Sequence, residues 1–242
     1  MTPVLLIARR ELAAYLRSMS GYVIIAAALF IDGLMFNGWA MGGDQGKLSA
    51  VVLGDFFYLT SGITMIASVL LSMRLLAEER QAGTLALLYS SPVRDHEIVL
   101  GKYLSALGFL AILLVLTGFM PALILVHGKL SFGQIAAGYV GLLLLGGAAL
   151  AIGTFGSALA RSQVVAAIVS AVMVTALIVC WFIARVTEHP LSQIFTSLSL
   201  YSQHFPPFQQ GIIHLRDVVY YLVVTYVALF AATRVLEARR WR

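Results

Sequence analysis

The sequence predicts an all-α, polytopic membrane protein with six transmembrane helices. Hydrophobic residues make up 60% of the 242 residues and charged residues only 11%, whereas a soluble domain carries about a quarter charged residues. The apolar residues also gather into runs of the length that a membrane-spanning helix needs, roughly 20 residues. Because these runs are apolar on every side, they predict helices and not the alternating strands of a barrel.

The runs are expected to form one transmembrane domain over residues 1–242. They place the spans near residues 21–40, 56–76, 103–126, 134–159, 163–185 and 217–235. With the N-terminus inside, 12 of the 16 Lys and Arg residues fall on the cytoplasmic side, which is the bias that the positive-inside rule describes. We therefore expect both termini in the cytoplasm. The net charge of +5 is attributed to these basic segments, and no nucleic-acid partner is expected.

An amphipathic interfacial helix is expected over residues 4–19, ahead of the first span. At 100° per residue Arg10 and Arg17 lie opposite one apolar face, which comprises Val4, Leu5, Ala8, Leu12, Tyr15, Leu16 and Met19. Such a helix lies in the plane of the lipid headgroups. It is either a plain basic anchor or a lever that moves with the spans, and the residues leave both roles open.

The loop between the second and third spans is expected to form a short cytoplasmic helix within residues 78–92. An apolar stripe runs along it, made of Gln81, Ala82, Leu85, Leu88 and Tyr89, and Pro92 ends or kinks the helix. An exposed apolar stripe needs a partner, either another polypeptide or the protein's own helix ends. Glu78 and Glu79 are expected to pair with Arg74 or Arg80.

A long segment of about 30 residues joins the fifth and sixth spans, well beyond ordinary loop length. It is rich in apolar side chains, and Pro206 and Pro207 divide it. We expect two short helices over residues 190–214 that dip into the outer leaflet or cap the bundle. Irregular backbone at that depth must be covered by protein or line a wet cavity.

Motifs for chemistry on this chain are missing from the sequence. Lys47, Lys102 and Lys129 follow glycine but lack the Ser or Thr of a phosphate-binding loop, so no catalytic residue is expected. The five histidines are scattered outside the spans, and neither a metal site nor a cofactor is expected. Asp32 is the one acid within a span. It either has a functional role or sits near Asn37, where water reaches it.

Two stretches carry a resemblance to a known family. Glu78-Glu79, Gly83-Thr84-Leu85, Ser91-Pro92 and Gly101-Lys102 resemble the coupling segment of type 2 ABC transporter permeases. Residues 197–221 and 234–241 are similar to the gliding-motility type of these permeases. The resemblance covers essentially the whole chain.

The resemblance implies partners. A separate ABC ATPase subunit would bind ATP and Mg²⁺, and a second permease chain, identical or related, would pair with this one in the bacterial cytoplasmic (inner) membrane. A membrane protein with a large outer domain would be a further, separate subunit. The helix at residues 4–19 would be an elbow. The residues that would transmit force from the ATPase are Glu78, Glu79, Gly83, Thr84, Leu85, Leu88 and Pro92.

The resemblance also implies a function. The chain would be the permease subunit of an exporter that moves an amphipathic or lipid-like substrate by alternating access. The candidate path or gate residues are Asp32, Asn37, Tyr201, Phe205 and Phe208. The alternative is a membrane subunit that transmits mechanical work to an outer-domain partner without moving a substrate.

Overall fold

The computed structural model describes residues 3–41, 49–83, 93–127, 131–188 and 191–240. Throughout these ranges the regular elements are helices, and no strand occurs. Six of the helical segments are long and apolar enough to cross a membrane. The predicted all-α fold with six membrane-spanning helices is therefore confirmed.

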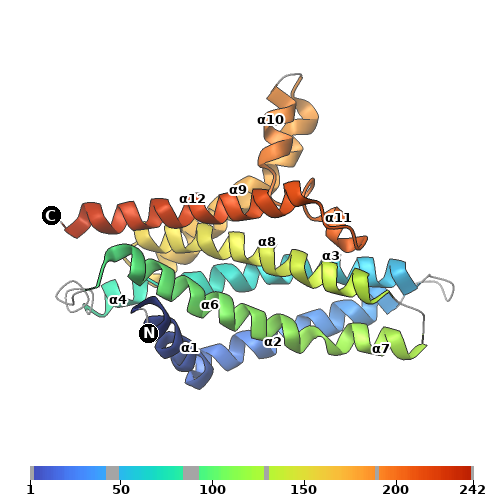
Figure 1. The fold of residues 1–242 in the computed structure, drawn as a ribbon, viewed down its shortest axis with the longest axis horizontal. Helices are drawn as coiled ribbons and strands as arrows, with labels where there is room; N and C mark the ends of the chain where they lie inside the picture. The colour runs from blue at the N-terminus through green and yellow to red at the C-terminus, as the bar shows by residue number, and fades with distance from the viewer. Residues whose placement is uncertain (1–2, 42–48, 84–92, 128–130, 189–190, 241–242) are drawn as a thin grey trace.

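The helices follow one another along the chain with short connections. Their bounds are α1 (Pro3–Arg17), α2 (Met19–Met35), the π-helical turn η1 (Phe36–Met41), α3 (Ser49–Ser72), α4 (Ala77–Gln81), α6 (Asp95–Thr117), α7 (Phe119–His127), α8 (Phe132–Leu159), α9 (Gln163–Val186), α10 (Leu191–Leu198), α11 (Pro206–Gln209) and α12 (Leu215–Arg240). Both chain ends lie at the same end of the bundle (Figure 1). We call it the termini end and the opposite one the far end.

Helix α8 occupies the middle of the bundle, between α3, α12, α9 and α6. It can do so because small residues run along it. At Gly138 an added Cβ would lie 2.2 Å from the ring of Phe57, and at Gly153 it would lie 2.0 Å from the hydroxyl of Ser72. Helices in lipid associate through such close backbone approaches, since lipid offers no hydrophobic force to drive them together.

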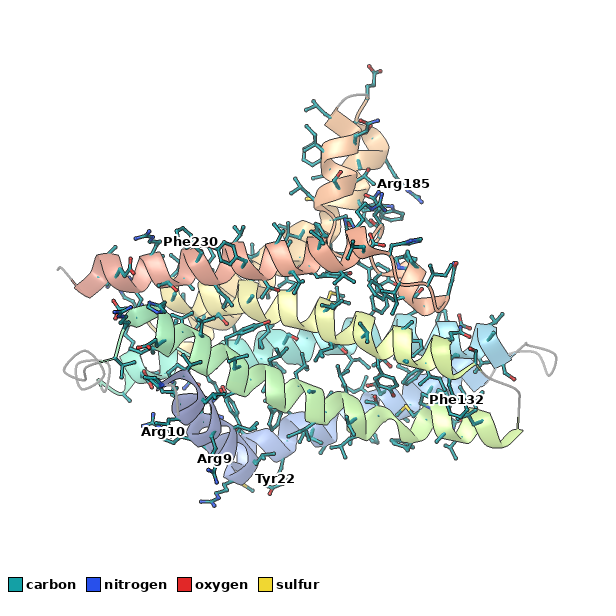
Figure 2. The ribbon with its side chains drawn as sticks, viewed as in Figure 1. Arg9, Arg10, Tyr22, Phe132, Arg185 and Phe230 are labelled. Carbon is teal, nitrogen blue, oxygen red and sulfur yellow. The ribbon has the colours of Figure 1, made fainter. Side chains whose placement is uncertain are left out.

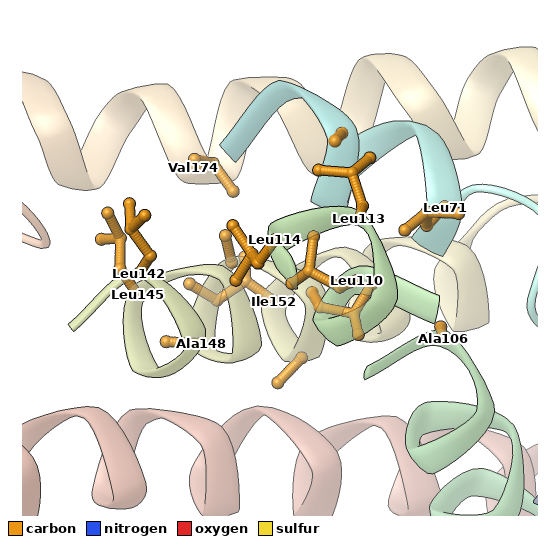
Figure 3. Packing of buried hydrophobic residues seen from close by; sticks show 14 of the residues in the cluster. Leu71, Ala106, Leu110, Leu113, Leu114, Leu142, Leu145, Ala148, Ile152 and Val174 are labelled. Carbon is orange, nitrogen blue, oxygen red and sulfur yellow. The ribbon is translucent and has the colours of Figure 1, made fainter. Parts of the chain in front are cut away.

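Leucines and other aliphatic side chains of α3, α6, α8 and α9 fill the space around this central helix (Figure 3). Leu110, Leu113, Leu142 and Leu145 are fully buried. By contrast α9 and α12 present many large apolar side chains to the outside, including Val172, Phe182, Tyr226 and Phe230. These faces are suited to lipid or to another membrane protein.

Two spans begin earlier than the uncharged runs predict. Helix α3 starts at Ser49 and not near residue 56, and α6 starts at Asp95 and not near residue 103. The prediction stopped at charged residues, but a helix continues where the protein itself pairs the charge. Lys102 is such a residue, because carboxylates of two other helices neutralise it.

The predicted third span is also interrupted. Helix α6 ends at Thr117 and α7 begins at Phe119, so Gly118 separates them. Pro121 explains the interruption, because proline lacks the N–H that would bond to the carbonyl four residues earlier. The threonine hydroxyl also bonds back to the Leu114 carbonyl at 2.7 Å.

Helix α1 packs lengthwise on α6, and Leu12 and Tyr15 of the predicted apolar face take part in this contact. Ile7 lies against Gly101, and the rings of Tyr15 and Phe109 lie 5.6 Å apart. Leu5 and Met19 of the same face are exposed on the protein. Helix α1 ends at Arg17, before the predicted end at residue 19, and Ser18 then caps the start of α2 and turns the chain.

The two short helices expected ahead of the last span are present as α10 and α11. The end of α9 and the whole of α10 project sideways from the bundle (Figure 1). Pro206 and Pro207 do divide the segment, and they also begin α11, since proline suits the first turn of a helix.

Candidate functional site

Charged side chains at the termini end connect α4 to the rest of the bundle. α4 follows α3 through a short turn and carries Glu78, Glu79 and Arg80. Each of these residues has a partner on another segment, described below. Arg9 and Arg10 of α1 point away from the helices (Figure 2) and lie outside this set of contacts, apart from the contact between Arg10 and Glu11.

Lys102 links three helices through its ammonium group. Its Nζ lies 2.7 Å from Oε1 of Glu79 on α4 and 3.6 Å from Oε1 of Glu11 on α1. The lysine side chain is only 4% exposed, and a buried charge needs such partners. Burial alone would raise the pKa of Glu11, but the charges of Lys102 and Arg10 outweigh it and hold the pKa below its usual value.

Arg74 links the end of α3 to the junction between α1 and α2. Its guanidinium donates two hydrogen bonds to the Glu78 carboxylate, at 2.9 and 3.0 Å, and one to the hydroxyl of Ser20. It also lies over the ring of Tyr15, 5.9 Å from the centroid, within the range of a cation–π contact. A cavity of about 150 Å³ lies among these side chains and Lys102.

The end of α8 is joined to α4 by a second set of hydrogen bonds. Ser157 Oγ accepts from the backbone N–H groups of Leu76 and Ala77, at 3.1 and 3.0 Å. Arg80 donates to the carbonyls of Ala158 and Ala160. These carbonyls belong to the last turn of α8, which has no intrahelical donors left for them. A displacement of α4 would therefore pull on α1, α6 and α8 together.

We expect the Ser157→Ala variant to lose about 1–2 kcal/mol of stability, because two buried N–H groups lose their acceptor. The measurement is the thermal unfolding midpoint of the purified chain in detergent. The matched control is Ser197→Ala, since Ser197 is exposed and its hydroxyl bonds only to a carbonyl of its own helix. Equal midpoints for the two variants would contradict this role of Ser157.

The predicted coupling residues are only partly within the described ranges. Glu78 and Glu79 have the charged partners given above, and Arg74 pairs with Glu78 as expected. Gly83 ends α4 in the left-handed conformation, with φ at +72°, which glycine adopts without strain. The remaining predicted residues, Thr84, Leu85, Leu88 and Pro92, lie outside the described residues.

Sequence reasoning missed several residues of this site. Lys102 was noted only as part of a glycine–lysine pair, although a lysine at the edge of an apolar run signals a need for acidic partners. Glu11 stands near the edge of the apolar face predicted for residues 4–19, a position that predicts no partner on another helix. Ser157 has no local signal, because serine is common in membrane helices and its role depends on α4 packing beside it.

The candidate path or gate residues divide into two groups. At the far end the rings of Tyr201 and Phe205 lie 5.4 Å apart, and Phe208 packs near Tyr221. Asp32 is buried and accepts a hydrogen bond from Thr60 at 3.1 Å, while Asn37 is exposed on η1. The interpretation that water reaches Asp32 beside Asn37 is wrong for this chain, because Asp32 is only 2% exposed.

The comparison with protein families matches residues 11–237 to the family described as ABC-2 family transporter protein. The match begins within α1, includes α2 to α11 in full and ends near the end of α12. The chain belongs to the ABC-2 transporter family. No curated protein is found to be similar to the chain.

Membership in the ABC-2 family makes this chain a transmembrane subunit of an ABC transporter and implies an ABC ATPase as its partner. Family membership also bears on the charged contacts of α4 at the termini end. The segment between the second and third spans is where the resemblance places the contact with the ATPase, and Glu78, Glu79 and Gly83 belong to it.

Proposed function

We propose that the chain is the permease subunit of an ATP-driven exporter. ATP binding and hydrolysis on a separate ATPase subunit move α4, and the bundle shifts between two states that differ in their access to the two sides of the membrane. The contacts of α4 carry this proposal. Lys102 connects it to α6 and α1, Arg74 to α2, and Ser157 and Arg80 to α8. Its movement therefore reaches four helices of the bundle.

The proposed orientation places the termini end in the cytoplasm of a bacterial cell. Its support is the distribution of Lys and Arg, because 12 of the 16 belong to the segments on that side. The far end then faces outward, and α10 projects from the side of the bundle (Figure 1). The Tyr201, Phe205 and Phe208 side chains would line the outer gate.

A second permease chain, identical or related, would complete the transporter. An apolar groove of about 560 Å³ between α3 and α9 supports this part of the proposal, with Ile66, Leu70 and Ile168 exposed along it. Such a seam would place the substrate path between two chains. Its apolar lining favours an amphipathic or lipid-like substrate.

The alternative function is mechanical transmission to a partner with a large outer domain, as in the gliding-motility type. One observation favours it. The core of the single chain is closely packed with fully buried leucine and phenylalanine side chains, among them Phe56, Phe57 and Phe109. A path would therefore have to lie between chains. If side chains also fill the interface between the two permease chains, no path remains and mechanical transmission is the function.

Co-purification tests the proposal. The tagged chain, extracted in mild detergent from its own cell, should bring down an ABC ATPase, and the complex should hydrolyse ATP while the isolated chain does not. Reconstituted vesicles then separate the two functions, since an exporter moves a fluorescent lipid analogue between leaflets in an ATP-dependent way. If the chain were active in a cell that lacks any companion ATPase, both export and mechanical transmission would be contradicted.

In the same vesicles we expect Gly83→Val to reduce lipid movement per ATP hydrolysed by about tenfold or more. A β-branched residue is strained at φ +72°, so the end of α4 must reorient. The control is Ala82→Val, because Ala82 is also exposed but has φ −80°. Unchanged lipid movement in Gly83→Val, with normal assembly, would show that this turn does not transmit force.

A further inference from the structure

A clamp of buried polar contacts holds the chain between α10 and α11 to the start of α12. His204 Nδ1 lies 2.8 Å from Oδ1 of Asp217, and His204 Nε2 lies 3.2 Å from the Ser197 carbonyl oxygen. Tyr220 stacks on the imidazole with centroids 3.7 Å apart. Tyr220 and Tyr221 also donate hydrogen bonds to the carbonyls of Leu198 and Leu200, each at 2.9 Å.

The protons on this pair can be counted from the geometry. A carbonyl oxygen and a carboxylate oxygen are both acceptors, and a neutral imidazole donates only one hydrogen bond. Satisfying both contacts of His204 therefore takes two protons, one on Nε2 and one between Nδ1 and Oδ1. When one proton leaves, a lone pair of the ring faces an acceptor oxygen, and one of the two bonds is lost.

Among the described residues, the Asp217 carboxylate has only His204 and Arg216 as side-chain hydrogen-bond partners. Asp217 is fully buried, and its Oδ2 has no hydrogen-bond partner among the described residues. Arg216 is the neighbouring cation, and its Nε–H donates a hydrogen bond to Oδ1 of Asp217 at 3.4 Å from an exposed side chain. The titratable groups facing the pair are Tyr220 and Tyr221 of α12, and Cys180 of α9 lies near Tyr220. A protonated His204 places its positive charge closer to the buried carboxylate than Arg216 does, at 2.8 Å against 3.4 Å.

We propose that the His204–Asp217 pair is a proton-operated lock at the far end. With two protons it fixes residues 199–211 to α12, and the loss of one proton releases them. The locked state thus carries one proton more than the released state, so acid favours the lock and base favours release. This lock does not depend on the proposed export function. If that function holds, the lock controls the segment that carries Tyr201, Phe205 and Phe208.

Hydrogen exchange of the purified chain in lipid nanodiscs tests the lock. The backbone N–H groups of Leu200, Phe205 and Gly211 are hydrogen-bonded, so their protection reports whether the segment is held. After correction for the intrinsic exchange rate, we expect protection of residues 199–211 to be about tenfold or more higher at pH 5.5 than at pH 8.5, the effect of one charge-assisted hydrogen bond.

The proposed lock predicts opposite levels of hydrogen-exchange protection for two variants. His204→Gln removes the titrating ring, so protection should be low and independent of pH. Asp217→Asn should stay protected at both pH values, because the asparagine N–H can donate to Nδ1 of a neutral imidazole whose Nε2–H still reaches Ser197. His214→Gln is the control, since His214 is exposed, and it should keep the response of the original chain.

The lock is overturned if the original chain shows equal protection at both pH values, or if His204→Gln retains the pH response. It is also overturned if Asp217→Asn loses protection at pH 5.5, because its hydrogen bonds should be complete there. If His204→Gln does not fold, the comparison of Asp217→Asn with the original chain decides the test. None of these outcomes requires an ATPase or a transported substrate, so the result is separate from that of the export assay.

Discussion

The Gly138→Val variant is expected to be destabilised by about 3 kcal/mol, the upper part of the range for overpacked cores. The new Cβ would lie 2.2 Å from two ring carbons of Phe57. That ring cannot retreat, because it is fully buried and has Phe56 and Tyr139 on its sides, with centroids at 5.2 and 5.6 Å. The helices α3 and α8 would have to separate.

Thermal unfolding and size-exclusion chromatography of the purified variant measure this effect. Gly54→Ala is the control, because Gly54 also lies in a membrane-spanning helix and an added Cβ there meets nothing within 4 Å. The control should unfold at the same temperature as the original chain or slightly above it, since alanine favours helix over glycine. A Gly138→Val protein as stable as this control would disprove the close packing of α3 on α8.

Replacing Lys102 with methionine is expected to cost roughly 3 kcal/mol, the lower end of the loss for a broken buried ion pair. Methionine fills a similar volume but leaves the carboxylates of Glu79 and Glu11 facing each other without the cation between them. These carboxylates are partly exposed, at 15% and 19%, and water therefore limits the loss. On the proposed function, α4 would also lose its connection to α1 and α6.

A double-mutant cycle with Glu79→Gln isolates the pair. The double variant should be more stable than the sum of the two single losses predicts, because neither charge is then left alone. Arg9→Met is the control, since Arg9 is exposed and points away from the bundle. Additive losses would mean that Lys102 and Glu79 do not interact, whereas a coupling of the expected sign supports the link between α6 and α4.

Much of the fold could be predicted because hydrocarbon imposes simple rules on a chain. An uncharged run of sufficient length must be helical, and this rule found six spans and the two short helices after α9. It failed at the edges of α3 and α6, because it treats every charge as a boundary. Lys102 shows why, since this charge is neutralised by residues far away in sequence.

The candidate site could be predicted only where its residues are close in sequence. Glu78, Glu79 and Gly83 stand in one segment and were recognised together. The partners of that segment are Glu11, Lys102 and Ser157, and nothing local connects them to it. The lock at the far end has the same character, because His204 was considered one of several scattered histidines and Asp217 was not considered.

Composition and the order of apolar runs by themselves determined that the chain crosses a membrane six times, since backbone groups in lipid must be paired within a helix. Only the tertiary structure decided which charges meet at Lys102 and that His204 lies between Asp217 and the Ser197 carbonyl. Pairing of buried charges depends on distance in space, and that distance is set by the packing of the helices, not by spacing along the chain.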